Sequence, residues 1–181
     1  MFLQIAGNDY ANTRKIMWIM TGCLLVMFTT GCVVRHIPKD WYKETIEFYE
    51  EGFASGWANE KQNLPINDEQ KDPNNKFGYL LRDLDGDGAD ELLIGLIDDS
   101  EETKFTDIYI WHSDIGSFRI ISAGEGYYVY LCPDNVIRED SWYGSKTKVD
   151  YLTYVSKDNA FLHVQTGGKP GKYELTPFVK D

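Results

Sequence analysis

The residues with the clearest chemical potential form an acidic loop, Asp83-Leu84-Asp85-Gly86-Asp87-Gly88-Ala89-Asp90-Glu91. Carboxylates at alternate positions can direct oxygens at one point, and glycine permits the sharp turn that this requires. Hard cations such as Ca²⁺ take six to eight oxygen ligands. Residues 83–102 contain nine acidic and no basic residues, and such crowding favours a bound cation. The sequence therefore predicts that a bound Ca²⁺ stabilises a hairpin here. A solvated acidic turn without metal is the alternative.

The spacing of these acids resembles the first half of an EF-hand calcium loop, with acids at positions 1, 3 and 5 and Gly88 at position 6. It departs at position 12, where Ile94 replaces the bidentate Glu, and its flanks are typical of strands. An acid at position nine followed by Leu is instead similar to FG-GAP and VCBS-type loops. Residues 79–95 look most like a segment of uncharacterised secreted lipoproteins from Gram-positive bacteria. The resemblance implies these calcium ligands: the carboxylates of Asp83, Asp85, Asp87 and Glu91, and the carbonyl oxygen of Ala89, with Asp90 pointing outward or binding through water.

An enzymatic interpretation of the same loop is also available. Asp83-Leu84-Asp85-Gly86 resembles the first motif of haloacid-dehalogenase-type phosphatases, in which the first Asp is a nucleophile and Mg²⁺ is bound. Here Asp87 stands where Thr is usual, and too little chain remains for that family's alternating parallel sheet. The three histidines lack the spacing of a zinc site, and no Gly-x-Ser-x-Gly motif or P-loop is present. A non-enzymatic protein is therefore favoured over a metal-dependent hydrolase.

The N-terminal segment predicts export. Arg14 and Lys15 precede the apolar run 16–28, which is too short to span a hydrocarbon core of ~30 Å comfortably. Thr29-Thr30-Gly31 then leads into Cys32, an ending that resembles the lipobox of bacterial lipoproteins, although Leu is usual in place of Thr29. The resemblance implies cleavage after residue 31, lipid on Cys32 and a location on the extracytoplasmic face of the bacterial membrane. Cleavage before Cys23, an uncleaved anchor and ordinary secretion are the alternatives.

The remaining chain predicts one α+β domain. We expect a signal peptide at residues 1–31, a tether at 32–39 and the domain at 40–181, with the calcium-loop hairpin at 83–91. Apolar residues at helical spacing predict an amphipathic helix over 40–60, capped by Asp40, and turn formers predict a loop over 61–76. Closely spaced apolar runs then predict a meandering antiparallel sheet on which this helix packs. The expected strands are 77–81, 92–97, 106–112, 118–122, 127–132, 136–138, 149–155 and 161–165.

Charge and aromatic content narrow the range of partners. Acidic residues outnumber basic ones 29 to 18, for a net charge of −11, which disfavours nucleic acid. The expected partners are the membrane, through the lipid anchor, and a cell-wall polymer or surface protein. Cys132 is expected to be buried rather than nucleophilic. Aromatic residues in the strand region are expected to form sheet core and cross-strand pairs, with a sugar- or peptide-binding face as the alternative. They are Trp111, Tyr127, Tyr128, Tyr130, Trp142, Tyr143, Tyr151 and Tyr154.

Overall fold

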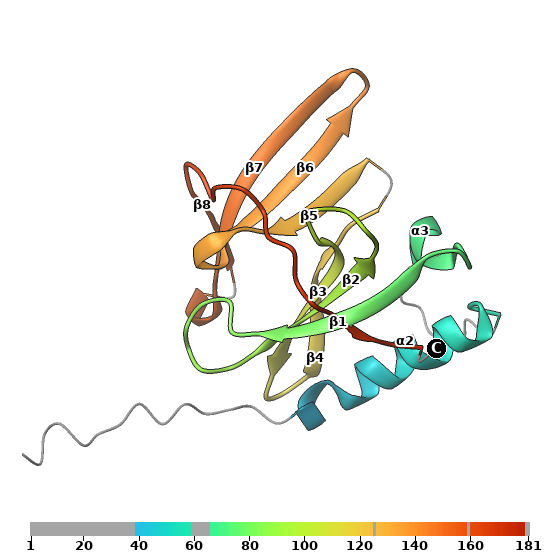
Figure 1. Ribbon diagram of the computed structural model, residues 1–181. Coiled ribbons are helices and arrows are strands. Elements are labelled where there is room, and N and C mark those ends of the chain that lie inside the picture. Colours follow the sequence, from blue (N-terminus) through green and yellow to red (C-terminus); the bar gives the residue numbers. More distant parts are fainter. Residues whose placement is uncertain (1–38, 59–65, 125, 159, 180–181) are drawn as a thin grey trace, which may run out of the picture. The chain divides into compact units, whose positions relative to one another are not determined.

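The computed structural model of the chain describes residues 39–58, 66–124, 126–158 and 160–179 (Figure 1). The expected signal peptide, most of the tether, and Cys32 lie outside the described residues. Within the described part, antiparallel strands dominate and one long helix precedes them. The prediction of a largely antiparallel sheet with a helix before it is therefore confirmed.

In the described part of the chain, nine strands form one sheet in which all pairs are antiparallel. In chain order they are β1 (Lys76–Arg82), β2 (Glu91–Ile97), β3 (Lys104–His112), β4 (Gly116–Ser122), β5 (Tyr127–Leu131), β6 (Ile137–Tyr143), β7 (Lys146–Val155), β8 (Ala160–His163) and β9 (Thr176–Pro177). Two short 3₁₀ turns connect later strands: η2 (Pro133–Asn135) lies between β5 and β6, and η3 (Ser156–Asp158) lies between β7 and β8.

The strand order is a meander with two departures. Strands β1 to β4 and strands β5 to β8 each pair in chain order, but β5 returns to β3 rather than pairing with β4. This is possible because β3 is long: its first residues, Lys104 and Phe105, pair with β5, and residues 107–112 pair with β4. The short β9 pairs with β1 at the other end of the order.

Strand β2 is buried on both of its faces. Because successive side chains of a strand point to opposite faces, Leu92 and Ile94 enter one buried cluster while Leu93 enters the other. All three side chains have no exposed surface. The first residue of this strand, Glu91, is 3% exposed, so a carboxylate begins the most deeply buried strand of the sheet.

The long helix is shorter than its sequence pattern predicts. It consists of the turn η1 (Lys39–Tyr42) and α2 (Lys43–Ser55), and no side chain caps its start, so the expected cap by Asp40 is wrong. Asp40 lies inside η1, and the residue that precedes α2 is Tyr42. The helix ends at Gly56 because this residue has φ +59, a left-handed conformation that glycine adopts readily.

Aromatic side chains of α2 contact residues of the sheet. Tyr49 has no exposed surface, and its hydroxyl lies 3.1 Å from the hydroxyl of Tyr109 on β3. The ring of Phe53 stacks on that of Phe77 on β1, with centroids 5.0 Å apart. Tyr49 and Phe53 are among the apolar residues at helical spacing in the segment 40–60.

A short helix, α3 (Asp68–Lys71), occupies part of the segment predicted as loop. The side chain of Asn67 accepts a hydrogen bond from the amide of Gln70, and the side chain of Gln70 accepts one from the amide of Asn67. This reciprocal capping box stabilises a single turn that is too short to give a hydrophobic period. The loop prediction is therefore wrong at residues 68–71.

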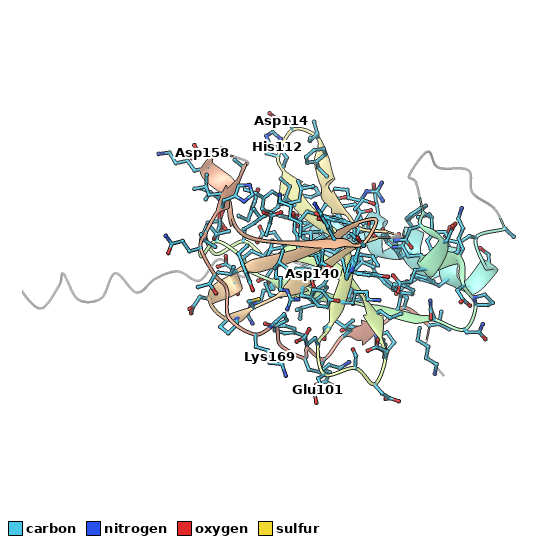
Figure 2. The ribbon with its side chains drawn as sticks, turned by 90° about the horizontal axis from the view of Figure 1, so that it is seen from above. Glu101, His112, Asp114, Asp140, Asp158 and Lys169 are labelled. Atoms are coloured by element: carbon cyan, nitrogen blue, oxygen red, sulfur yellow. The ribbon has the colours of Figure 1, made fainter. Side chains whose placement is uncertain are left out.

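The β3–β4 hairpin ends in a tight turn at residues 113–115. The amide of Asp114 donates a hydrogen bond to Nδ1 of His112 over 3.2 Å, and both residues are exposed at this end of the sheet (Figure 2). Figure 2 also shows Glu101 and Lys169, which form an exposed ion pair of 3.0 Å.

Candidate metal centre

The acidic loop joins β1 to β2 at the point where their pairing ends. Arg82 and Glu91 are the last paired residues, so residues 83–90 close the hairpin. Gly86 and Gly88 have φ of +79 and +87, conformations that other residues adopt only with strain. The sequence folds into this hairpin because two apolar strands flank a turn that contains glycine at both left-handed positions. The prediction of flanking strands rather than EF-hand helices is confirmed.

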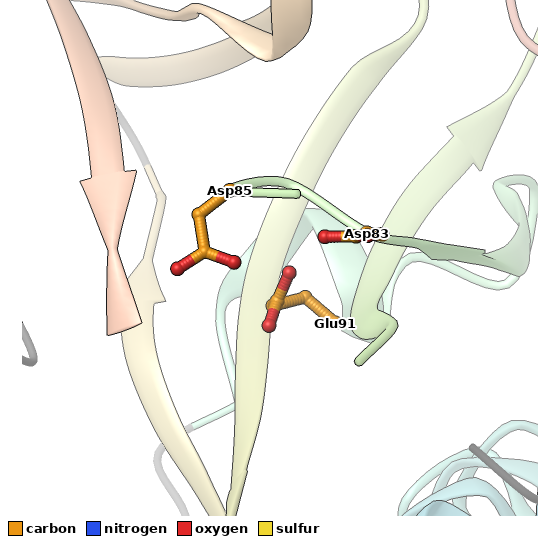
Figure 3. A group of neighbouring side chains, drawn as sticks. All are labelled: Asp83, Asp85 and Glu91. Carbon is orange, nitrogen blue, oxygen red and sulfur yellow. The ribbon is translucent and has the colours of Figure 1, made fainter. Parts of the chain in front are cut away.

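Three carboxylates of the hairpin converge. One oxygen each of Asp83, Asp85 and Glu91 lies within 4.8 Å of the others (Figure 3). Two come from the loop and one from the first residue of β2, so the hairpin itself brings them together. Within the described part of the chain, this is the group of acidic, histidine or cysteine residues with the spacing for a metal ion.

One predicted carboxylate ligand, Asp87, lies outside this group. The Oδ1 atom of Asp87 accepts a hydrogen bond from the amide of Ala89 over 2.7 Å. Its Oδ2 atom lies 3.1 Å from the hydroxyl of Ser156, which donates to it. Asp87 is therefore turned toward its own loop and η3. Asp90 also lies outside the group.

Backbone amides hold the loop carboxylates in place. The carboxylate of Asp83 accepts hydrogen bonds from the amides of Gly86 at 2.7 Å and Gly88 at 2.9 Å. Asp85 accepts one from the amide of Asp87 at 3.2 Å. Each carboxylate oxygen has two lone pairs, so one amide bond leaves capacity for a cation. The loop is therefore ordered by the same groups that could ligate a metal.

Glu91 has the most perturbed environment of the group. Burial, together with the nearby charges of Asp85, Asp87 and Asp83, raises the pKa of its carboxyl group to about 8. The Leu84 amide, which donates to this carboxylate over 2.8 Å, acts in the opposite direction and lowers the pKa. Burial also raises the pKa of the neighbouring Tyr154 to about 12, with contributions from Glu91 and Asp85. A cation among these oxygens would favour the ionised carboxylate. The donor set, oxygen only and net negative, fits a hard divalent cation.

Three distant segments secure the loop, and sequence reasoning missed all of them. The hydroxyl of Tyr42 on η1 donates to the carbonyl of Asp90 over 3.0 Å. The side-chain amide of Asn135 donates to the carbonyl of Asp83 over 2.7 Å. The amide of Ser156 donates to Oδ2 of Asp85 over 2.6 Å. Separations of 48, 52 and 71 residues leave no local pattern that could have revealed these contacts.

The structure also shows the surroundings of Cys132 and of the aromatic residues of the strand region. Cys132 is 1% exposed, which confirms its predicted burial, and its Sγ lies 3.4 Å from the carbonyl oxygen of Gly168. Tyr154 is buried in the core, whereas Trp142 is 40% exposed. Tyr154 therefore has the predicted core role, and the partly exposed Trp142 on β6 makes a cross-strand contact with the ring of Tyr128 on β5.

Comparisons of the chain with protein-family models, curated proteins and solved structures gave no match. Within the described residues, no helix combines the length and apolar character needed to cross a membrane.

Proposed function

We propose that the β1–β2 loop binds Ca²⁺ and that the ion has a structural role in a non-enzymatic bacterial lipoprotein. The observation that carries the metal proposal is the convergence of Asp83, Asp85 and the buried Glu91 within 4.8 Å. Asp87 and the carbonyl of Ala89 complete the proposed ligand set after local adjustment of the loop. The ion would neutralise carboxylates that otherwise repel one another next to the protein core.

Calcium is favoured over other divalent cations by the nature of the donors. Zinc and copper sites usually include histidine or cysteine, and this group has neither. Magnesium demands near-ideal octahedral geometry and retains several waters, whereas Ca²⁺ accepts irregular sets of carboxylate and carbonyl oxygens. An extracellular site needs a Kd of only ~10⁻⁴–10⁻³ M to be filled.

Thermal unfolding of the full chain tests the calcium site. Calcium at ten times Kd would contribute roughly 1.4 kcal/mol, which corresponds to a rise in Tm of about 3–6 °C for a domain of this size. We expect Asp83→Asn to abolish this rise. Asp114→Asn, which changes an exposed acid in the β3–β4 turn, serves as the matched control and should retain it. An equal calcium response in both variants would contradict the site.

The location on the membrane is proposed from residues 14–32 of the sequence. A lipid on Cys32 would place the α+β domain, residues 40–181, on the extracytoplasmic face, where calcium is available. The aromatic contacts of α2 with β1 and β3 support a helix packed on the sheet as the arrangement of this domain.

Labelling with radioactive palmitate tests the anchor: Cys32→Ser should remove label and membrane association, and Cys23→Ser should leave both intact.

A second candidate function is recognition of a cell-wall glycan or peptide. It is favoured by the exposed Trp142, whose ring lies edge-on to Tyr128 with centroids 5.0 Å apart. The ammonium group of Lys104 lies 4.1 Å from the centre of the Tyr128 ring, so a cation and two aromatic rings adjoin. Trp142→Ala should abolish retention on purified cell wall if this function holds, while Val149→Ala, an exposed apolar control, should not.

A further inference from the structure

The turn region of the β3–β4 hairpin exposes apolar side chains. Ile115 is 65% exposed, the highest value among the exposed large hydrophobic residues of the described chain, and Phe118 is 43% exposed. The only charged residue between Trp111 and Phe118 is Asp114, apart from the titratable His112. Single exposed apolar residues are common, so their position in the molecule decides whether they have a role.

This hairpin end lies beside the first residues of the folded domain. The hydroxyl of Ser117 on β4 forms a hydrogen bond with that of Thr45 at the start of α2. The ring of Trp111 stacks on that of Trp41 in η1, with centroids 5.1 Å apart. Figure 1 shows the same arrangement: the β3–β4 turn and the beginning of the helix lie side by side. The exposed apolar residues therefore lie at the end of the domain where the chain enters it.

The length of the preceding chain limits the distance from the proposed lipid. Lys39 begins η1 and follows Cys32 by only seven residues. Fully extended, seven residues span at most about 25 Å. With lipid on Cys32, this end of the domain remains close to the headgroups. This step rests on the lipid anchor proposed above.

The local charge is also compatible with a phospholipid surface. In residues 39–44, Lys39 and Lys43 balance Asp40 and Glu44. The whole chain has a net charge of −11, so most of its surface would be repelled by anionic headgroups. The entry end, defined here as residues 39–44 together with the turn region 112–118, lacks this excess. Trp41 and Trp111 are of the residue type that is enriched at membrane–water interfaces.

We propose that the entry end docks on the bilayer that holds the lipid anchor, with Ile115 and Phe118 inserted among the headgroups. The occupant of this apolar surface is a phospholipid membrane rather than a protein partner. The contact fixes the orientation of the domain, so that η1 and the β3–β4 turn face the membrane.

Depth-dependent fluorescence quenching tests this docking. The mature lipidated protein, which begins at Cys32, is reconstituted in vesicles of equal parts phosphatidylglycerol and phosphatidylcholine, with a nitroxide on the acyl chain of the latter. An environment-sensitive fluorophore is attached through Ile115→Cys, with Leu162→Cys on β8 as the control, because Leu162 is similarly exposed at 52%. Peptide mapping verifies the labelled position, and unchanged Tm verifies folding of each variant.

The proposal predicts that the nitroxide removes most of the fluorescence at position 115 and leaves that at position 162 unchanged. If the nitroxide removes the same fraction of the fluorescence at both positions in protein that floats with the vesicles, docking is overturned and the anchor stands. Protein that fails to float would refute the anchor and the docking together, and the flotation step makes this result distinct. An added label at Phe118→Cys should behave as the label at position 115 does; a different response would also contradict insertion of this turn region.

Discussion

Glu91 is the buried member of the carboxylate group formed by Asp83, Asp85 and Glu91. It is almost completely buried, and in the metal-free protein its pKa is raised by burial to about 8. A carboxyl group with a higher pKa in the folded state stabilises the fold below its unfolded pKa of about 4.5. This contribution is lost as the pH rises through about 8, because the buried group must ionise.

The first prediction concerns the pH dependence of the metal-free protein. Its Tm should decrease between about pH 5 and pH 8, and excess Ca²⁺ should reduce this decrease because the cation stabilises the ionised carboxylate. Calorimetric scans in metal-depleted buffers, with and without added Ca²⁺, measure both effects. Glu91→Gln is the control, because it cannot titrate and should remove this part of the dependence.

The same substitution gives a second prediction, at a single pH. At pH 8 without metal, Glu91→Gln should raise Tm, since it removes a buried charge while retaining an acceptor for the Leu84 amide. In calcium, the variant should lose the ion-dependent stabilisation. Without metal, the variant should therefore be more stable than the wild type. In calcium, it should be less stable than the wild type. A loss of Tm under both conditions would indicate a purely structural role for Glu91.

Among the elements, the β1–β2 hairpin loop depends on a particular backbone conformation. Gly86 has φ +79 and no neighbouring atom within 4 Å of an added Cβ, so Gly86→Ala tests the backbone conformation alone. We expect a loss of about 1–2 kcal/mol in unfolding free energy, measured by urea denaturation in calcium. Gly124→Ala, where φ is not left-handed and the closest atom is 3.6 Å away, should have a smaller effect.

A buried ion pair connects other elements away from the loop. Asp107 on β3 lies 3.0 Å from Arg119 on β4 and accepts a hydrogen bond of 2.6 Å from Gln70 on α3. Asp107→Ala should cost about 3–5 kcal/mol, because it leaves the partly buried guanidinium without this carboxylate. Urea denaturation measures the loss. Glu101→Ala, which removes a fully exposed ion pair with Lys169, should leave the denaturation midpoint unchanged.

How far sequence predicts each element depends on burial. The buried runs in β1, β2 and β3 gave clear signals, whereas β6 extends to Tyr143 and β7 begins at Lys146, well beyond the predicted segments 136–138 and 149–155. The extra residues 139–143 and 146–148 are mostly polar, and the buried Asp140 is itself charged, so they lack the apolar alternation of a half-buried strand. The α3 turn was missed although the Asn67-x-x-Gln70 pattern of a capping box was present in the sequence.

For the whole molecule, the spacing of acids predicted where carboxylates converge, because Asp83, Asp85 and Glu91 belong to one hairpin. It did not predict the loop's contacts with Tyr42, Asn135 and Ser156, because tertiary folding brings these residues together. An ion at this position would therefore connect the β1–β2 hairpin with η1, η2 and η3 through one set of contacts. Its removal should affect the stability of the domain beyond the loop alone.

The net charge of −11 is also distributed unevenly over the molecule. Part of it is concentrated in the proposed calcium loop, and the entry end of the domain is nearly neutral. This distribution is suited to an acidic protein that is held at a membrane by one end.

Calorimetric titration of Ca²⁺ into the metal-depleted full chain tests the proposed calcium site most directly. If the loop binds calcium as proposed, one ion should bind per chain with a Kd of ~10⁻³ M or lower. Asp83→Asn should not bind the ion, and Asp114→Asn should bind it as the wild type does. Absence of binding heat up to millimolar Ca²⁺, together with a Tm that is the same in calcium and in chelator, would contradict the proposed site.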